Sequence, residues 1–132
     1  MTSKLQLSFD RLENALKSLD AMLNKPLDKD RAVMDASIHR FEFTIELYWK
    51  LLKRIIESLG KEVSYPKEVL REAYAGNLID DEITWLAMLN DRNETSHTYN
   101  EDVANKIYEH IRSYYPIMKK TFDVLYQKYY PD

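Results

Sequence analysis

Large apolar residues recur at alternating spacings of four and three residues near the amino terminus of this chain. The series comprises Leu5, Phe9, Leu12, Leu16, Leu19 and Leu23. A repeat near 3.6 residues places all of them on one face of an α-helix, which then packs against other helices. Proline disfavours helix at the residue before it, so the run Asn24-Lys25-Pro26 ends this segment. The first element is therefore predicted to be a helix over residues 5–23.

The same spacing recurs through most of the chain, and no segment shows the alternation of a strand. A second helix is predicted to begin near Asp28 and to reach Leu59, where Gly60 terminates it. Its seam comprises Met34, Ile38, Phe41, Ile45, Tyr48, Leu52, Ile55 and Leu59. Its other face also carries apolar residues, namely Phe43, Leu47, Trp49 and Leu51. A helix that is apolar on two sides lies centrally or contributes to a subunit interface.

Three more helices are expected in the second half of the chain. A proline at the first position and a glycine past the end mark a short helix over residues 66–75. Asp80 and Asp81 favour the start of the next helix. Residues 100–102 suit the start of a long last helix, which Pro116 should kink. The seam of that last helix comprises Val103, Ile107, Ile111, Tyr114, Met118, Leu125 and Tyr129.

The composition fits one globular domain. The chain has 132 residues, of which 45% are hydrophobic and 31% are charged, so it can bury a core and is too apolar to be disordered. We expect a single all-α domain over residues 1–132, built as an antiparallel up-and-down four-helix bundle with one shorter extra helix. No stretch is apolar enough to cross a bilayer, and no signal-type apolar core follows the amino terminus. These features predict a cytoplasmic protein without membrane contact.

Several kinds of site are excluded by residue type. The absence of cysteine excludes disulfides, thiolate metal sites and thiol nucleophiles. His39 and His110 lack partners at metal-ligand spacing, and the two glycines, Gly60 and Gly76, are too few for a Gly-rich phosphate loop. A net charge of −3 argues against a broad basic surface that coats nucleic acid. We therefore expect no metal and no cofactor, and any nucleotide to be held by a partner.

One segment concentrates groups that suit phosphodiester chemistry. It reads RNETSHTY and runs from Arg92 to Tyr99. Arginine binds phosphate through a planar fork of donors, and histidine exchanges protons near neutral pH. On a straight helix Arg92 and His97 would lie about 140° apart, whereas Asn93 and Asn90 would share the face of His97. The pair converges only if the helix ends or distorts between them, or if the substrate lies in a cleft at a two-fold subunit interface.

A simpler interpretation of this segment stays open. Arg92 pairs with a nearby acid such as Glu94, and Asn90, Asn93 and His97 cap a helix end. Tyr99 is expected in the turn before the last helix, where its phenol reaches solvent or the active site of a partner.

Packing or subunit contact is the expected role of the aromatic residues elsewhere in the chain. These are Trp49, Trp85, Tyr108, Tyr114, Tyr115, Tyr126, Tyr129 and Tyr130. On the second helix, Glu42, Glu46 and Lys50 follow one another at four-residue steps, which favours ordinary surface pairs. Arg40 and Lys53 suggest a small basic patch that the intervening acids dilute.

These residues carry a resemblance to a known family. RNETSHTY at 92–99 matches the R-x4-H-x-Y signature of the toxin branch of the HEPN superfamily, and RFEFTIELYWK at 40–50 resembles a second characteristic stretch. Over residues 5–130 the chain is similar to nucleotidyltransferase substrate-binding proteins. The resemblance implies a helical bundle that forms a two-fold dimer and is bound by a cognate minimal nucleotidyltransferase.

The resemblance also implies roles for individual residues. Members of the toxin branch are metal-independent ribonucleases that act on RNA, and the partner silences them by transferring AMP to a tyrosine. By position, Arg92 and His97 are then the catalytic pair, Asn93 is a polar helper and Tyr99 accepts AMP. One alternative is a non-catalytic subunit that presents substrate, or itself, to the nucleotidyltransferase. A structural bundle without partner chemistry is a third possibility.

Overall fold

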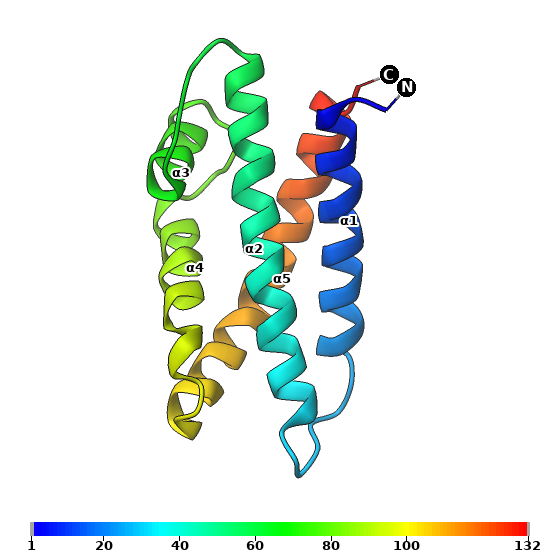
Figure 1. Cartoon of the computed structure of the whole chain (residues 1–132), viewed down its shortest axis with the longest axis vertical. Coiled ribbons are helices and arrows are strands. Elements are labelled where there is room, and N and C mark those ends of the chain that lie inside the picture. Colours follow the sequence, from blue (N-terminus) through cyan, green and yellow to red (C-terminus); the bar gives the residue numbers. More distant parts are fainter. Residues whose placement is uncertain (1, 132) are drawn as a thin grey trace.

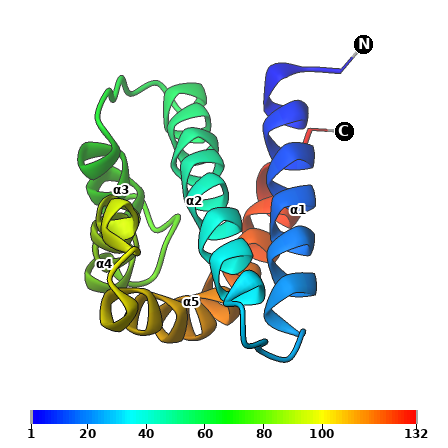
Figure 2. The same ribbon diagram turned by 60° about the horizontal axis from the view of Figure 1, so that its bottom comes forward.

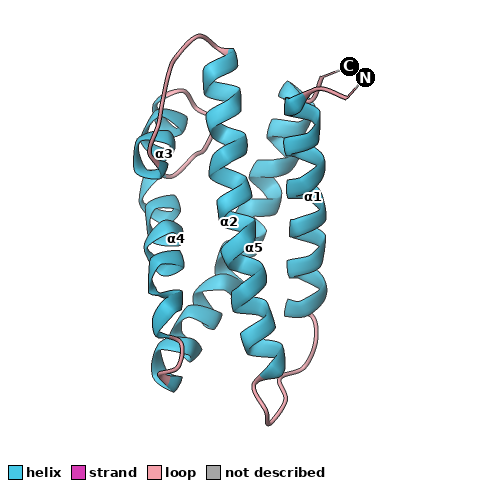
Figure 3. Cartoon of the chain, viewed as in Figure 1, coloured by secondary structure: helices cyan, strands magenta, loops and turns pink. Residues whose placement is uncertain are grey.

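The computed structural model describes residues 2–131, and within this range it contains helices and no strand. The elements are α1 (Lys4–Leu23), α2 (Ala32–Ser58), α3 (Pro66–Ala75), α4 (Glu82–Glu94), the 3-10 turn η1 (Thr95–His97) and α5 (Glu101–Tyr129). The predicted all-α fold class is confirmed (Figure 3).

The helices α1, α2, α4 and α5 run alternately down and up, as predicted, and the short α3 packs beside α2 and α4 (Figure 1). The helix α2 contacts each of the other four helices, which confirms its predicted central position. The connection between α1 and α2 and the connection between α4 and α5 lie at the same end of the bundle (Figure 1). That end carries the residues of the RNETSHTY segment. The two-fold dimer stays a prediction.

The predicted seams form most of the core. In α1 every seam residue from Phe9 to Leu23 is buried, and Leu5 is half-buried. The seam of α2 is buried except at Leu59, which is 63% exposed because the helix has already ended at Ser58. Gly60 has a φ of 98°, a left-handed conformation that glycine adopts without strain. Its N–H donates to the Glu57 carbonyl at 3.0 Å and so satisfies a carbonyl of the last turn.

Helix starts follow their capping residues. As predicted, α4 begins after Asp81, whose carboxylate accepts from the Thr84 N–H at 3.1 Å. Likewise α5 begins after Asn100. The helix α2 begins at Ala32, later than the predicted Asp28. The Asp28 carboxylate nevertheless accepts from the Val33 N–H at 3.1 Å, so it caps α2 from the preceding loop.

The last helix continues through Pro116. In Figure 2, α5 runs across the bottom of the view and then rises behind α1, a change of direction that fits the kink predicted for a proline inside a helix. Most of the aromatic residues pack as predicted. Trp85, Tyr108 and Tyr114 are buried, and Trp49, Tyr115, Tyr129 and Tyr130 lie partly buried against the core. Tyr126 is 37% exposed, but its ring packs against those of Phe9 and Tyr130.

Candidate functional site

The helix ends between the two residues of the predicted catalytic pair. Arg92 lies in the last turn of α4, which stops at Glu94, and His97 lies in η1. The separation of about 140° on a straight helix therefore does not apply. Two threonines close the helix end: Thr95 Oγ1 donates to the Arg92 carbonyl at 2.7 Å, and Thr98 Oγ1 donates to the Thr95 carbonyl at 2.9 Å.

The expected caps at this helix end were wrong. The bonds to the last carbonyls come from threonine hydroxyls rather than from Asn90, Asn93 or His97. The polar face predicted for these three residues also does not form as one helical stripe, because α4 stops before His97. All three side chains are exposed to solvent.

Arg92 is held by a residue of another helix. Its Nε donates to Glu46 Oε1 of α2 at 2.9 Å, so the predicted partner Glu94 was wrong. The second oxygen, Glu46 Oε2, accepts from the Trp49 indole N–H at 3.1 Å. Glu46 thus binds Arg92 and Trp49 rather than forming the ordinary surface pair with Lys50. The two Nη groups of Arg92 make no hydrogen bond within residues 2–131, and Nη groups are donors with which arginine side chains bind phosphate.

His97 and Tyr99 lie together at the exposed end of the bundle. Their ring centroids are 6.1 Å apart, with an angle of 73° between the ring planes. Tyr99 is 84% exposed in the turn before α5, as predicted. No hydrogen bond joins Arg92 to His97 in the described part of the chain. The single chain thus presents the imidazole and the phenol side by side, and the guanidinium is paired with Glu46.

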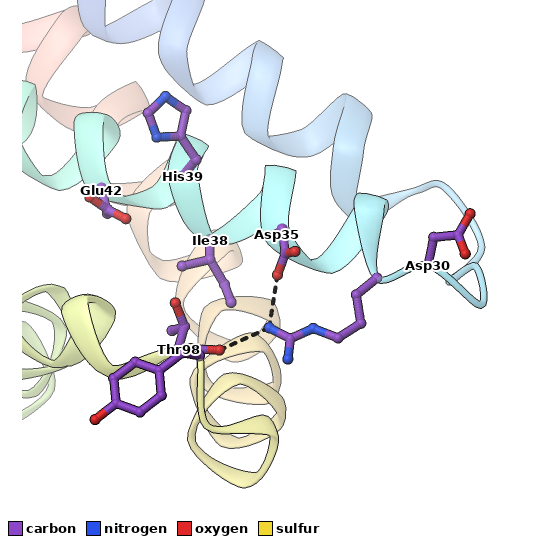
Figure 4. A pocket seen from close by; sticks show the side chains of 8 residues that line it. Asp30, Asp35, Ile38, His39, Glu42 and Thr98 are labelled. Atoms are coloured by element: carbon purple, nitrogen blue, oxygen red, sulfur yellow. Dashed lines mark hydrogen bonds and ion pairs between the residues drawn. The ribbon is translucent and has the colours of Figure 1, made fainter.

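A hollow of about 420 Å³ lies beside Tyr99 (Figure 4). It is lined by Asp30, Arg31, Asp35, Ile38, His39, Glu42, Thr98 and Tyr99. Arg31 Nη2 donates to the Thr98 carbonyl at 3.0 Å and to Asp35 Oδ1 at 2.8 Å, the two bonds dashed in Figure 4. These bonds fasten the turn between His97 and Tyr99 to the start of α2. Sequence reasoning missed Arg31, because the contact joins residues far apart in the chain.

A second polar cluster joins α4 to α5. Asp91 is 8% exposed, and its Oδ2 lies 2.8 Å from His110 Nδ1 and accepts from the Tyr114 hydroxyl at 2.5 Å. Burial raises the pKa of Tyr114 well above its usual value, and the bond to Asp91 adds to this effect. We call Asp91, His110 and Tyr114 the α4–α5 cluster. From the sequence, the cluster could have been inferred from Asp91 alone, an acid three residues after Met88 and therefore on the buried side of α4.

Within residues 2–131, no three histidine, aspartate or glutamate side chains are placed to hold a metal ion. Across the same range, no helix is both long and apolar enough to pass through a bilayer.

Comparison with known proteins assigns the family. The family described as "nucleotidyltransferase substrate binding protein like" matches residues 7–127, almost the whole chain. The chain belongs to this family. The chain is similar to the "probable ribonuclease HepT" of Haemophilus influenzae. The two are 33% identical, and the match covers 84% of this chain and 85% of that protein.

Two solved structures resemble this family member. A crystal structure of a protein from Thermus thermophilus matches with a TM-score of 0.79 and 33% identity, covering 86% of this chain and 98% of that one. The structure of HI0074 from Haemophilus influenzae, described as the fold of a substrate binding domain of a nucleotidyltransferase, matches with a TM-score of 0.67. It is 27% identical and covers 92% of this chain and 96% of that chain.

The two stretches that carried the family resemblance meet in space. Residues 40–50 lie on α2 and include Glu46 and Trp49, whereas residues 92–99 span the end of α4, η1 and the following turn. The ion pair between Arg92 and Glu46 joins them directly. Both stretches therefore contribute to one candidate site.

Proposed function

We propose that this chain is a HEPN-type ribonuclease toxin, paired with a minimal nucleotidyltransferase that silences it by transferring AMP to Tyr99. The observation that carries the proposal is the exposed pair of His97 and Tyr99, which follow by five and seven residues an arginine whose Nη groups make no hydrogen bond within residues 2–131. Family membership and the similarity to a probable ribonuclease support the same function.

Each residue has a defined role in the proposed cleavage. His97 takes the proton of a ribose 2′-hydroxyl, or gives a proton to the leaving oxygen, a role that typically contributes about 10² to 10⁴-fold. The Nη groups of Arg92 stabilise the charge that grows on the phosphate. Asn93, exposed one residue after Arg92, is a polar helper for the bound strand. In a two-fold dimer, the motifs of both chains line one cleft, which brings guanidinium and imidazole to the same phosphate.

The proximity of Tyr99 to His97 gives the proposed control a physical basis. The Tyr99 oxygen attacks the α-phosphorus of ATP, an O–P bond forms, and pyrophosphate leaves while a base takes the phenolic proton. The attached AMP then lies beside the His97 ring, whose centroid is 6.1 Å from that of Tyr99. A bulky anion at this position blocks the imidazole and repels the phosphates of RNA.

Cleavage assays with matched variants test the nuclease function. The unsubstituted protein should cleave RNA without added metal, and Arg92→Ala and His97→Ala should each lower the rate by at least about a hundredfold. Arg71→Ala, an exposed arginine on α3, is the matched control and should cleave normally. Equal cleavage by all four proteins would reject Arg92 and His97 as catalytic residues.

A non-catalytic substrate-binding subunit is the second candidate function. It is favoured by the ion pair that engages Arg92 with Glu46 in the single chain. Purification together with the nucleotidyltransferase and labelled ATP distinguishes the two functions. Label on Tyr99 supports the toxin pair, and a stable complex without label on this chain supports the substrate-binding subunit.

A further inference from the structure

A second hollow, of about 320 Å³, lies on the C-terminal half of α2 and is positively charged. It is lined by Trp49, Lys50, Lys53, Arg54 and Glu57, so three cations face one acid. Lys50 and Arg54 are exposed, and Trp49 and Lys53 are half-buried. We call these four residues, without Glu57, the basic hollow. The predicted basic patch included Arg40 and Lys53. Arg40 does not belong to it, because its side chain donates to the Ser18 carbonyl of α1 at 2.6 Å.

The charge along α2 changes sign at the candidate site. The hollow beside Tyr99, at the N-terminal half of α2, contains three carboxylates, those of Asp30, Asp35 and Glu42, against the single guanidinium of Arg31. The basic hollow lies beyond Glu46 on the same helix, and Glu46 binds Arg92 between the two hollows. A polyanion is therefore repelled at the Tyr99 side and attracted at the Trp49 side.

A continuous set of contacts connects the basic hollow to Arg92. Trp49 lines the hollow and donates its indole N–H to Glu46, and Glu46 accepts from Arg92 Nε. From Glu46 to Arg54 is about 12 Å along the helix axis, at 1.5 Å per residue. A ligand that lies over Trp49 is therefore close to the Arg92 guanidinium.

We propose that the basic hollow binds single-stranded RNA and delivers it to the Arg92–His97 site. Lys50, Lys53 and Arg54 bind successive phosphates, and one base stacks on the Trp49 ring. Cations beside an aromatic platform are the usual means of binding a single strand without base readout. The inference rests on the proposed ribonuclease function, for which it names the substrate surface. It also explains how a protein of net charge −3 holds RNA, since the contact is local.

Salt-dependent binding tests the proposal. Binding of a fluorescent single-stranded RNA is measured by anisotropy, with His97→Ala as the parent protein so that the RNA stays intact. Replacing Lys50, Lys53 and Arg54 by alanine should weaken binding and reduce the slope of log K against log salt by about 2, since each phosphate contact contributes roughly 0.7. Trp49→Ala should weaken binding at least about fivefold, whereas Trp49→Phe, which keeps an aromatic ring but loses the N–H to Glu46, should retain most of it.

A control of equal charge separates the hollow from net charge. Lys4, Lys120 and Lys128 are exposed on α1 and α5. Replacing them removes an equal number of positive charges and should leave the slope nearly unchanged. An equal loss of slope in this control, or an unchanged slope in the basic-hollow variant, overturns the proposal. So does a basic-hollow variant that binds RNA normally but no longer binds the nucleotidyltransferase, because the hollow then docks a protein.

Two results separate this inference from the proposed function. If the unsubstituted protein binds RNA through the basic hollow but does not cleave it, the nuclease function fails and the binding site stands. If the protein cleaves RNA and the basic-hollow substitutions, made without His97→Ala, change neither binding nor cleavage, the function stands and the binding site fails.

Discussion

Glu46 holds Arg92 through Nε and thereby determines which guanidinium nitrogens face a ligand. The two side chains are 36% and 32% exposed, so solvent screens the ion pair and limits its effect on stability to under about 1 kcal/mol. Their geometric effect is larger, because the direction of the Nη groups depends on this bond and on the bond from Trp49. Glu46 is therefore proposed as a positioning residue.

Glu46→Ala should separate positioning from stability. We expect kcat for RNA cleavage to fall about tenfold with KM little changed, because a transition-state contact is weakened rather than substrate binding. The free energy of unfolding in urea should fall by less than about 1 kcal/mol. A large loss of stability with normal kcat would instead make Glu46 a structural residue.

Arg31 makes a contact that sequence reasoning did not predict. Its backbone adopts the left-handed conformation, with a φ of 61°, which non-glycine residues rarely occupy. The guanidinium bonds to Asp35 and to the Thr98 carbonyl accompany this conformation. The sequence around Arg31 contains no local pattern that predicts a contact with the turn at Thr98, which lies far from it in the sequence.

At the scale of the helices, the α4–α5 cluster fixes how the end of α4 sits on the rest of the bundle. Asp91 precedes Arg92, so a bond from Asp91 to α5 restrains the helix turn that carries the arginine. The Tyr114 ring also stacks on Phe41 of α2, with centroids 5.9 Å apart. The cluster thus connects α2, α4 and α5 beside the candidate site.

Tyr114→Phe should weaken this connection and change the response to alkali. Loss of a hydrogen bond to a buried carboxylate should destabilise the fold by about 1.5–3 kcal/mol at neutral pH. Because the pKa of Tyr114 is raised in the folded state, the native protein keeps this proton where the unfolded chain loses it. The stability it contributes is complete below the ordinary tyrosine pKa and is lost as pH rises above it.

Urea denaturation between neutral pH and pH ~11 measures this difference, since the ordinary tyrosine pKa is about 10. The variant should lose less stability than the unsubstituted protein over the alkaline part of the range. Tyr48 also has a raised pKa, caused mainly by burial, so both proteins should retain some alkaline sensitivity. Parallel curves for the two proteins would contradict the role given to Tyr114.

The helices were predictable because their signals are local. The seam of α1 and the caps Asp81 and Asn100 depend on residues within a few positions of one another, and the structure bears them out. The partners Glu46 for Arg92 and Asp91 for Tyr114 depend on how helices are placed in space. Periodicity shows that a face is buried, but it does not show which side chain of another helix it meets.

At the scale of the whole molecule, the proposed nuclease requires a second copy of the chain to complete its cleft. In one chain, Arg92 faces Glu46 of α2, whereas His97 is exposed in η1 beside Tyr99. In the proposed dimer, a cleft shared by two chains would let the guanidinium of one protomer and the imidazole of its partner reach one phosphate. A single chain would then be inactive, and activity should follow dimer formation as protein concentration rises.

Subunit mixing tests this shared cleft. Arg92→Ala and His97→Ala are each expected to be inactive, but a heterodimer of the two keeps one of the two Arg92–His97 pairs that the shared cleft of the unsubstituted dimer would contain. Random assembly at equal concentrations makes half of the dimers mixed, so about a quarter of the unsubstituted activity should return. Mixing Arg92→Ala with the double variant Arg92→Ala/His97→Ala is the control, and it should restore no activity. If the mixed sample also stays inactive although heterodimers are demonstrated, a cleft that needs only one Arg92 and one His97 from different protomers is excluded. Both residues must then come from one chain, or both copies of each residue are needed.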